Sequence, residues 1–219
     1  MNKRSTERIP YGFMKHERYS VLVMNSEKIQ VVKLMFSLCL DGMSLGQIKK
    51  VIESQGIEYP AKYKKDKMVG WSLAEIRKIF LDPVYGNERY SAIAKEELEI
   101  ARRMLTLNTR VVGKRMELSA LVGNSVCKEC GSFLVEKLVS TRGRTYLYYI
   151  CGKNKKEKGC STHKIAVQEL NEKVFVKMRR DIEDREALCC KGLTRKIAIK
   201  YLRYVSVDCA GNIELILNT

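Results

Sequence analysis

The stretch Cys127-Lys128-Glu129-Cys130-Gly131 decides how the second half of this 219-residue chain folds. Two residues between the cysteines let both thiolates reach one metal ion, and the glycine permits the tight backbone that this arrangement requires. A second pair, Cys151 and Cys160, follows a segment with strand-like alternation. The layout C-x2-C, hairpin, C-x8-C predicts a zinc ribbon in which four thiolates close a tetrahedral, structural site for one zinc ion.

The eight cysteines leave alternatives to this interpretation. His163 could replace Cys160 as the fourth ligand, and the four thiols could also be unrelated buried side chains. Closely spaced cysteine pairs in a cytoplasmic chain favour metal binding over disulfides. Cys39 lies in an apolar helical run and is interpreted as a small core residue. The sequence assigns no role to the remaining three, Cys189, Cys190 and Cys209.

The residues around the metal-binding cysteines have the pattern of a β-rich domain. Strands are expected at residues 133–139, 145–151, 199–207 and 213–217. Turns at 141–144 and 210–212 join them in pairs, and a helix is expected from 166 to about 183.

The first half of the chain has helical periodicity instead. Apolar residues recur at helical spacing in four segments, residues 27–40, 44–56, 73–81 and 95–107. Ser44 with Gln47, and Ser72 with Glu75, have the spacing of a capping box. A polar, basic loop between the second and third helices contains Lys62, Lys64 and Lys65.

These patterns divide the chain into three parts and place it in the α+β class. Residues 1–107 are expected to form a mainly helical domain. Residues 108–118, with Gly113 and several basic side chains, have the composition of a linker. Residues 119–219 are expected to form a zinc-ribbon β domain with a helix.

The charge of the chain points to a polyanionic partner. The net charge is +16, and residues 108–164 contain twelve Lys and Arg against four Glu. Such an excess suits nucleic acid first and an anionic membrane surface second. Cations of the ribbon that could lie along a phosphate backbone are Arg142, Arg144, Lys153, Lys155 and Lys156. No segment approaches the roughly 18 apolar residues that span a bilayer, and residues 1–10 are unlike a secretory signal, so we expect a cytoplasmic protein.

The order of motifs in the helical half carries a family resemblance. The series is Ile9-Pro10-Tyr11-Gly12-Phe13, Glu27, Asp41-Gly42-Met43-Ser44, Gly56-Ile57, Trp71-Ser72, Ile76 through Leu81, Asp82-Pro83 and Val84-Tyr85-Gly86. It resembles the recombinase domain of the large serine recombinases. That family places a zinc ribbon directly after this domain, as Cys127 and Cys130 do here, and residues 162–176 resemble the helix after its last zinc ligand. The similarity extends from about Ile9 to Leu217.

The resemblance implies binding to attachment sites on phage, transposon or cassette DNA. In that family the recombinase domain reads part of a half-site mainly through the major groove, the linker follows the minor groove, and the ribbon reads a further major-groove segment. The DNA-binding residues implied by position are Arg77, Lys78, Arg110, Lys114, Arg115, Arg142 and Arg144. We add the lysines of the basic loop to this set.

The expected partner is double-stranded DNA, together with a catalytic recombinase domain or a second copy of the chain on the DNA. No membrane and no small-molecule substrate is expected. The family's nucleophilic serine lies in an N-terminal resolvase fold, and this chain begins near the recombinase domain, so we expect no catalysis by this chain alone. It would be an expressed fragment, a truncated reading frame or a separate accessory protein. Residues 181–194 leave little room for the family's coiled coil, which puts a role in synapsis in question.

Three other functions are alternatives. A non-catalytic zinc-ribbon regulator or decoy of recombination needs the same DNA contacts. An RNA-binding ribbon could stack bases on Tyr146, Tyr148 and Tyr149, although strand alternation places some of these rings in the core. A self-sufficient enzyme is disfavoured because His16 and His163 are the only histidines, too few for the common histidine-based catalytic motifs.

Overall fold

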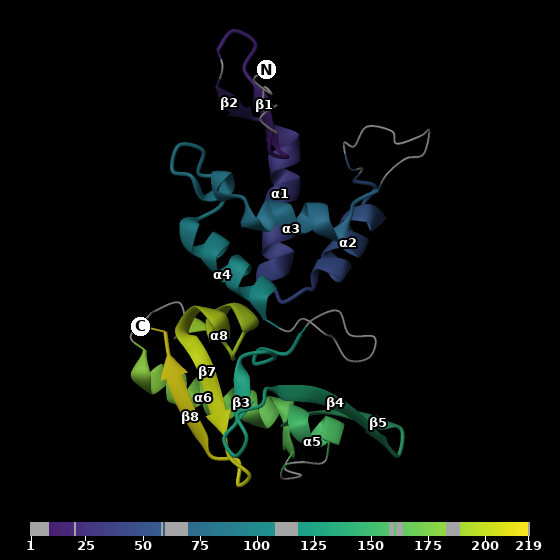
Figure 1. Ribbon diagram of the computed structural model, residues 1–219, viewed down its shortest axis with the longest axis vertical. Helices are drawn as coiled ribbons and strands as arrows, with labels where there is room; N and C mark the ends of the chain where they lie inside the picture. The colour runs from purple at the N-terminus through teal and green to yellow at the C-terminus, as the bar shows by residue number, and fades with distance from the viewer. Residues whose placement is uncertain are drawn as a thin grey trace, which may run out of the picture. The chain divides into compact units, whose positions relative to one another are not determined.

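The computed structural model describes residues 9–19, 21–57, 59, 70–107, 118–157, 160, 164–182 and 189–218 (Figure 1). The chain divides into two compact units. Unit 1 consists of Met1–Cys39 and Leu45–Arg102, and unit 2 of Leu40–Ser44 and Arg103–Thr219. Unit 1 is mainly helical and unit 2 mixes strands with helices, which is the α+β class expected from the sequence.

Within the described residues, the first half of the chain contains four α-helices, close to the predicted positions. They are α1 (Ser26–Leu40), α2 (Leu45–Ser54), α3 (Leu73–Leu81) and α4 (Lys95–Thr106). A 3-10 helix, η1 (Pro83–Gly86), follows α3. An antiparallel hairpin of β1 (Phe13–Lys15) and β2 (Leu22–Met24) precedes α1. This hairpin is absent from the sequence prediction because three-residue strands are too short to produce a periodic pattern.

The core of unit 1 lies where α1, α2 and α3 bring their apolar faces together. Phe36 of α1 lies against Phe80 of α3, with ring centroids 4.7 Å apart. Ile52 of α2 is fully buried. Trp71, just before α3, is 1% exposed and donates a hydrogen bond from Nε1 to the carbonyl of Ile57 at 2.9 Å. The indole therefore ties the end of the second helical segment to the start of the third.

Helix α3 begins and ends for the reasons expected from the sequence. The Ser72 hydroxyl accepts a hydrogen bond from the backbone N–H of Glu75 at 3.1 Å, which satisfies one of the free amides at the helix start. The helix ends before Asp82, because the residue before Pro83 is pushed out of helical geometry. The buried face of α3 consists of Ile76, Ile79 and Phe80.

Unit 2 contains two three-stranded sheets. Its strands are β3 (Ser125–Cys127), β4 (Leu134–Thr141), β5 (Arg144–Cys151), β6 (Lys164–Ala166), β7 (Leu202–Val207) and β8 (Ile213–Leu217). One sheet has the order β3-β7-β8, with β3 parallel to β7 and β7 antiparallel to β8. The other has the order β4-β5-β6 and is antiparallel throughout.

Three helices accompany these sheets in the described part of unit 2. They are α5 (Gly152–Glu157), α6 (Val167–Asp181) and α8 (Arg195–Tyr201). Helix α6 contacts β5, β6 and β8 through an apolar face that includes Leu170, Val174 and Met178. These side chains join Cys127 and Cys151 in one core. The predicted hairpin and the predicted helix after it are both present, with ends that differ by a few residues.

The structure corrects two expectations for this half. Residues 199–201 end helix α8 and do not begin a strand, since β7 starts at Leu202. Ile197, Ala198 and Ile199 are all buried, so this run has no alternating pattern that would distinguish a helix from a strand. The segment between Cys151 and Cys160, in which the sequence predicts neither a helix nor a strand, contains helix α5.

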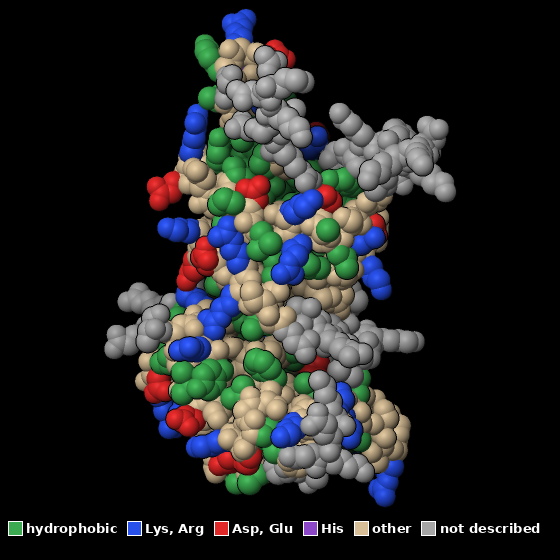
Figure 2. Space-filling view, in the orientation of Figure 1, with side chains coloured by type: hydrophobic (Ala, Val, Ile, Leu, Met, Phe, Trp, Pro, Cys, Tyr) green, Lys and Arg blue, Asp and Glu red, His purple; other side chains and the backbone are tan. Residues whose placement is uncertain are grey.

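The exterior carries many charged side chains. On the face shown in Figure 2, Lys and Arg side chains lie over both units, with fewer Asp and Glu side chains between them. None of the helices in the described part of the chain has both the length and the hydrophobicity needed to cross a membrane.

Candidate metal centre and nucleic-acid interface

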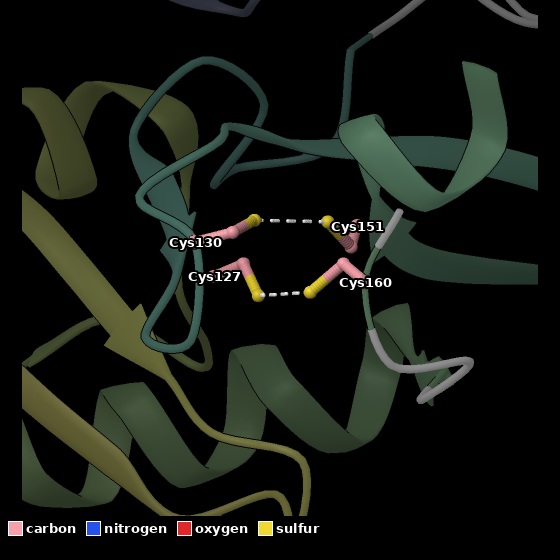
Figure 3. Close-up of side chains that lie close together, drawn as sticks. All are labelled: Cys127, Cys130, Cys151 and Cys160. Atoms are coloured by element: carbon pink, nitrogen blue, oxygen red, sulfur yellow. Dashed lines mark hydrogen bonds between the residues drawn. The ribbon is translucent and has the colours of Figure 1, made fainter. Parts of the chain in front are cut away.

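Four cysteine side chains of unit 2 meet at one point (Figure 3). The Sγ atoms of Cys127, Cys130, Cys151 and Cys160 all lie within 4.8 Å of one another. Cys127 and Cys160 are separated by 3.7 Å, and Cys130 and Cys151 by 3.4 Å. Sulfur ligands bound at about 2.3 Å to one tetrahedral ion lie about 3.8 Å apart. The structure thus brings together the four cysteines predicted from the sequence, at distances that fit a single metal ion.

Two strand ends and two short connections position the sulfurs. Cys127 ends β3, and a tight turn leads from it to Cys130. The turn is closed by the N–H of Gly131, which donates to the carbonyl of Cys127 at 2.8 Å. Gly131 has a φ of 68°, in the left-handed region that glycine adopts without a steric penalty. Cys151 ends β5 and Cys160 follows α5. Cys127 and Cys130 therefore approach the centre from one side, and Cys151 and Cys160 from the other (Figure 3).

The protonation of the thiols depends on their surroundings. Burial, followed by a hydrogen bond to the carboxylate of Glu129, raises the pKa of the Cys127 thiol, and burial also raises the pKa of Cys151. Hydrogen bonds with the side chain and then the backbone of Ser132 lower the pKa of Cys130 to about 6. A bound divalent cation would favour the thiolate at every position, because a coordinating thiol is deprotonated.

The remaining cysteines are not members of this cluster, although the backbone N–H of Cys209 donates to the carboxylate of Glu129, which also bonds Cys127. Cys39 is 3% exposed in the core, as expected for a small apolar residue. Cys189 and Cys209 are exposed, and Cys190 is partly buried. His163, the alternative fourth ligand, lies outside the described residues. Cys160 completes the sulfur cluster without it.

The tip of the β4–β5 hairpin has an unusual backbone. Thr141 pairs with Arg144, which leaves Arg142 and Gly143 as a two-residue loop. Their φ angles are 51° and 74°. A two-residue loop with two positive φ angles is the type I′ turn, which matches the twist of the strands and favours Asn-Gly or Gly-Gly. The backbone of Arg142 is therefore in a conformation that is unfavourable for residues other than glycine. Arg142 and Arg144 are both exposed.

One face of the β4-β5-β6 sheet combines basic and aromatic side chains. Lys137 pairs with Tyr148 across the hairpin, and side chains alternate along each strand, so Arg144, Tyr146 and Tyr148 share a face with Lys137. Lys164 of β6 lies on the same face, with Nζ 4.8 Å from the centroid of the Tyr148 ring. These five residues are called the hairpin face below.

The hairpin face contains two cations that sequence reasoning missed, Lys137 and Lys164. The alternation Arg144, Tyr146, Tyr148 could have indicated such a face, but only the strand register adds the two lysines. Tyr146 is 44% exposed, whereas Tyr149 on the opposite face is fully buried. Tyr149 therefore has no surface on which a base could stack, which removes one ring from the RNA-binding alternative.

The other predicted DNA-binding residues are placed in part. Arg77 and Lys78 are exposed on α3, and Lys78 forms an ion pair with Glu75 at 3.1 Å. Lys153 and Lys155 are exposed on α5, and Lys155 donates a hydrogen bond to the carbonyl of Glu136 at 3.3 Å. The predicted residues outside the described part of the chain are Lys62, Lys64, Lys65, Arg110, Lys114, Arg115 and the side chain of Lys156.

Comparison with known proteins agrees with this architecture. Residues 26–112 match the family model described as Recombinase, and residues 120–179 match the recombinase zinc beta ribbon domain. A solved structure described as "Sequence Requirements of the Listeria innocua prophage attP site" is similar with a TM-score of 0.51 and 15% identity, over 100% of this chain and 93% of that one. Another, "Crystal Structure of a LSR-DNA Complex", has a TM-score of 0.48 and 11% identity, over 100% and 92%. A comparison with curated proteins finds no match.

The fold consists of a helical domain followed by a ribbon domain whose four-cysteine cluster is compatible with a metal site. The two family matches together cover about two thirds of the chain and occur in the order predicted from the sequence. The chain belongs to the recombinases that these two models describe, and it contains their recombinase and zinc-ribbon domains. Both domains indicate DNA binding in site-specific recombination.

Proposed function

We propose that the chain binds duplex DNA sequence-specifically at the attachment sites of a mobile element, as the DNA-recognition region of a large serine recombinase. We also propose that the ion held by the four cysteines is zinc and that its role is structural. Four sulfur ligands in a tetrahedron leave no open position for water or substrate, which suits zinc as a structural ion. The proposed division is a recombinase domain at residues 1–107, a basic linker at 108–118 and the ribbon domain at 119–219.

The observation that carries the proposal is the position of Arg142. A left-handed conformation costs a non-glycine residue roughly 1–2 kcal/mol, and Asn or Gly would relieve this cost in a type I′ turn. An arginine here gives up stability, which strained positions at functional sites commonly do. Its exposed guanidinium extends the charge of Arg144 at the end of a hairpin whose other end is held by Cys151 and the metal. A phosphate contact accounts for the arginine.

The hairpin face provides the rest of the proposed ribbon contact. Within the described residues of the sheet it carries three cations, Lys137, Arg144 and Lys164, and no acidic side chain. Glu136, the carboxylate nearest in sequence, lies on the opposite face and is 2% exposed. A rigid, basic surface of this kind binds the phosphate backbone with little loss of conformational entropy. The proposal also retains the sequence-predicted cations of α3, α5, the basic loop and the linker as DNA contacts.

The test uses Arg142→Asn, a variant that separates folding from binding. Asn favours the turn, so we expect the free energy of unfolding to rise by about 0.5–1 kcal/mol. DNA binding should nevertheless weaken, and the slope of log K against log salt should become shallower by about 0.9, because one phosphate contact fewer releases fewer counterions. Fluorescence anisotropy with duplexes from the flanks of the encoding locus, across a salt series, measures both quantities.

Arg180→Asn is the matched control, since it removes the same charge from the exposed end of α6. This variant should keep the wild-type salt slope. An unchanged slope in Arg142→Asn would remove the hairpin tip from the interface. Equal binding of the wild-type chain to scrambled duplexes at every salt concentration would argue against site recognition and favour the alternative, a non-catalytic regulator or decoy. A preference for single-stranded RNA over duplex DNA would contradict both.

A further inference from the structure

The exposed side of helix α3 carries an apolar and basic stripe. Leu73, Arg77 and Leu81 are spaced four residues apart, so they follow one another along a single side of the helix. Leu73 is 49% exposed and Leu81 is 46% exposed, although both are large hydrophobic residues. Figure 2 shows basic and hydrophobic side chains next to one another over this part of unit 1. The stripe borders the buried face of α3, and its half-exposed leucines and exposed Arg77 remain accessible to a partner.

The central residue of the stripe is Arg77. Among the described residues, none forms an ion pair or a hydrogen bond with the Arg77 side chain. The neighbouring Lys78 is engaged by Glu75 at 3.1 Å. Glu75 itself lies to the side of the stripe and is partly buried. A guanidinium without a partner in the described part of the chain, placed between two exposed leucines, presents five donors flanked by apolar surface.

We propose that this stripe reads bases in the major groove, with Arg77 on a guanine and with Leu73 and Leu81 on the methyl groups of thymines. The inference rests on the proposed function and names the side chains that would determine specificity in unit 1. Arginine binds the O6 and N7 acceptors of guanine with two hydrogen bonds, and thymine is the base that offers an apolar group in the major groove. The stripe therefore combines the side-chain chemistry of both contacts.

The spacing of the stripe limits where the thymines lie. Four residues of α-helix rise by about 6 Å, and successive base pairs are about 3.4 Å apart. Each leucine is thus displaced from Arg77 by about two base pairs along a groove of about 12 Å width that accommodates a helix. The expected target contains a guanine with a thymine methyl about two base pairs away on either side, on whichever strand presents it.

The experiment replaces thymine by deoxyuridine, which lacks only the methyl group and keeps the base pairing. The full-length, metal-loaded chain first selects its preferred duplexes from a randomised pool. Each thymine of the selected motif is then replaced in turn, and the dissociation constant is measured by anisotropy. At the two thymines that flank the guanine we expect binding to weaken about fourfold, which corresponds to the transfer of one methyl-sized group back to water.

The leucine variants show which side chain causes the sensitivity to each thymine methyl group. Leu81→Ala should bind the thymine and deoxyuridine forms equally at one of the two positions, and Leu73→Ala at the other. Both leucines are half exposed, so truncation should leave the circular dichroism melting curve of the chain unchanged. Val176→Ala, which shortens a side chain that is 54% exposed on α6, is the control and should keep the wild-type sensitivity at both positions.

Two results would overturn the inference, and they differ from failure of the proposed function. If a motif is selected but deoxyuridine binds as thymine does, the methyl contacts do not exist. If the sensitivity persists in Leu73→Ala and Leu81→Ala, other side chains make them. A pool from which no motif emerges would contradict site-specific binding itself, and this inference with it.

Discussion

Removal of the hydroxyl of Tyr149 should destabilise unit 2, because this hydroxyl satisfies a buried backbone amide. Tyr149 is fully buried, and its hydroxyl oxygen accepts a hydrogen bond from the backbone N–H of Leu121 at 3.1 Å. Leu121 belongs to the turn that leads into β3 and so to Cys127. Burial raises the pKa of the Tyr149 hydroxyl, so the group is neutral and acts only through hydrogen bonding.

The magnitude follows from the buried amide that Tyr149→Phe leaves without its partner. An unsatisfied buried donor costs about 1–3 kcal/mol, whereas the phenyl ring keeps its packing. With a urea dependence of about 2 kcal/mol per molar, the unfolding midpoint of unit 2 should fall by about 0.5–1.5 M. Tyr146→Phe provides the matched control, because this ring lies on the same strand and is 44% exposed.

The assay follows the two units separately. Release of the bound metal to a chromogenic chelator during urea titration reports unit 2. Fluorescence of Trp71, the only tryptophan of the chain, reports unit 1. We expect Tyr149→Phe to release metal at lower urea with the Trp71 transition unchanged, and Tyr146→Phe to match the wild type. Identical metal-release midpoints for both variants would refute the argument, since they would show that the hydrogen bond from the Leu121 N–H to Tyr149 does not stabilise unit 2.

Two further changes test the metal centre and the packing of unit 1. Cys127→Ser should abolish metal binding and unfold unit 2, because structural zinc sites contribute about 10 kcal/mol or more to folding. Cys189→Ser is the control and should keep one ion per chain. The metal content is measured by mass spectrometry, and retained stoichiometry in Cys127→Ser would rule out the four-cysteine assignment. Gly86→Ala would place a Cβ 2.6 Å from Cδ2 of the buried Leu98, so the melting temperature should fall with a cost of about 1–3 kcal/mol. Gly46→Ala in α2 meets nothing within 4 Å and should instead stabilise by about 0.5 kcal/mol, and a lower melting temperature there would contradict the packing description.

The four clustered cysteines could be found from the sequence because their signal is local. Two residues separate Cys127 from Cys130, a glycine follows, and the need of a metal ion for four ligands then points to the second pair. Helix α3 was also predictable, since its cap at Ser72 and its stop before Pro83 act over a few residues. Such signals depend on neighbouring residues alone, so they can be recognised without knowledge of the fold.

Other features depend on residues that are distant in the chain. The parallel pairing of β3 with β7 joins Val126 to Ser206, and no local pattern encodes a contact across that separation. The strand predicted at residues 199–207 includes the last three residues of α8, because the consecutive buried residues Ile197, Ala198 and Ile199 lack a periodicity that distinguishes helix from strand. The same holds for Lys164, whose place beside Tyr148 follows from the register of β6 on β5.

The sequence by itself indicated the class of protein through the resemblance of its motif order to a known family. It also predicted the cluster of four cysteines and the helical character of the first half, because caps, short cysteine spacings and amphipathic periodicity are properties of nearby residues. Only the tertiary structure decided which cations share a surface and which leucines remain exposed on α3. It also placed Arg142 in a left-handed turn. Strand register and burial determine these features, and both are set by the packing of the whole unit rather than by any one segment.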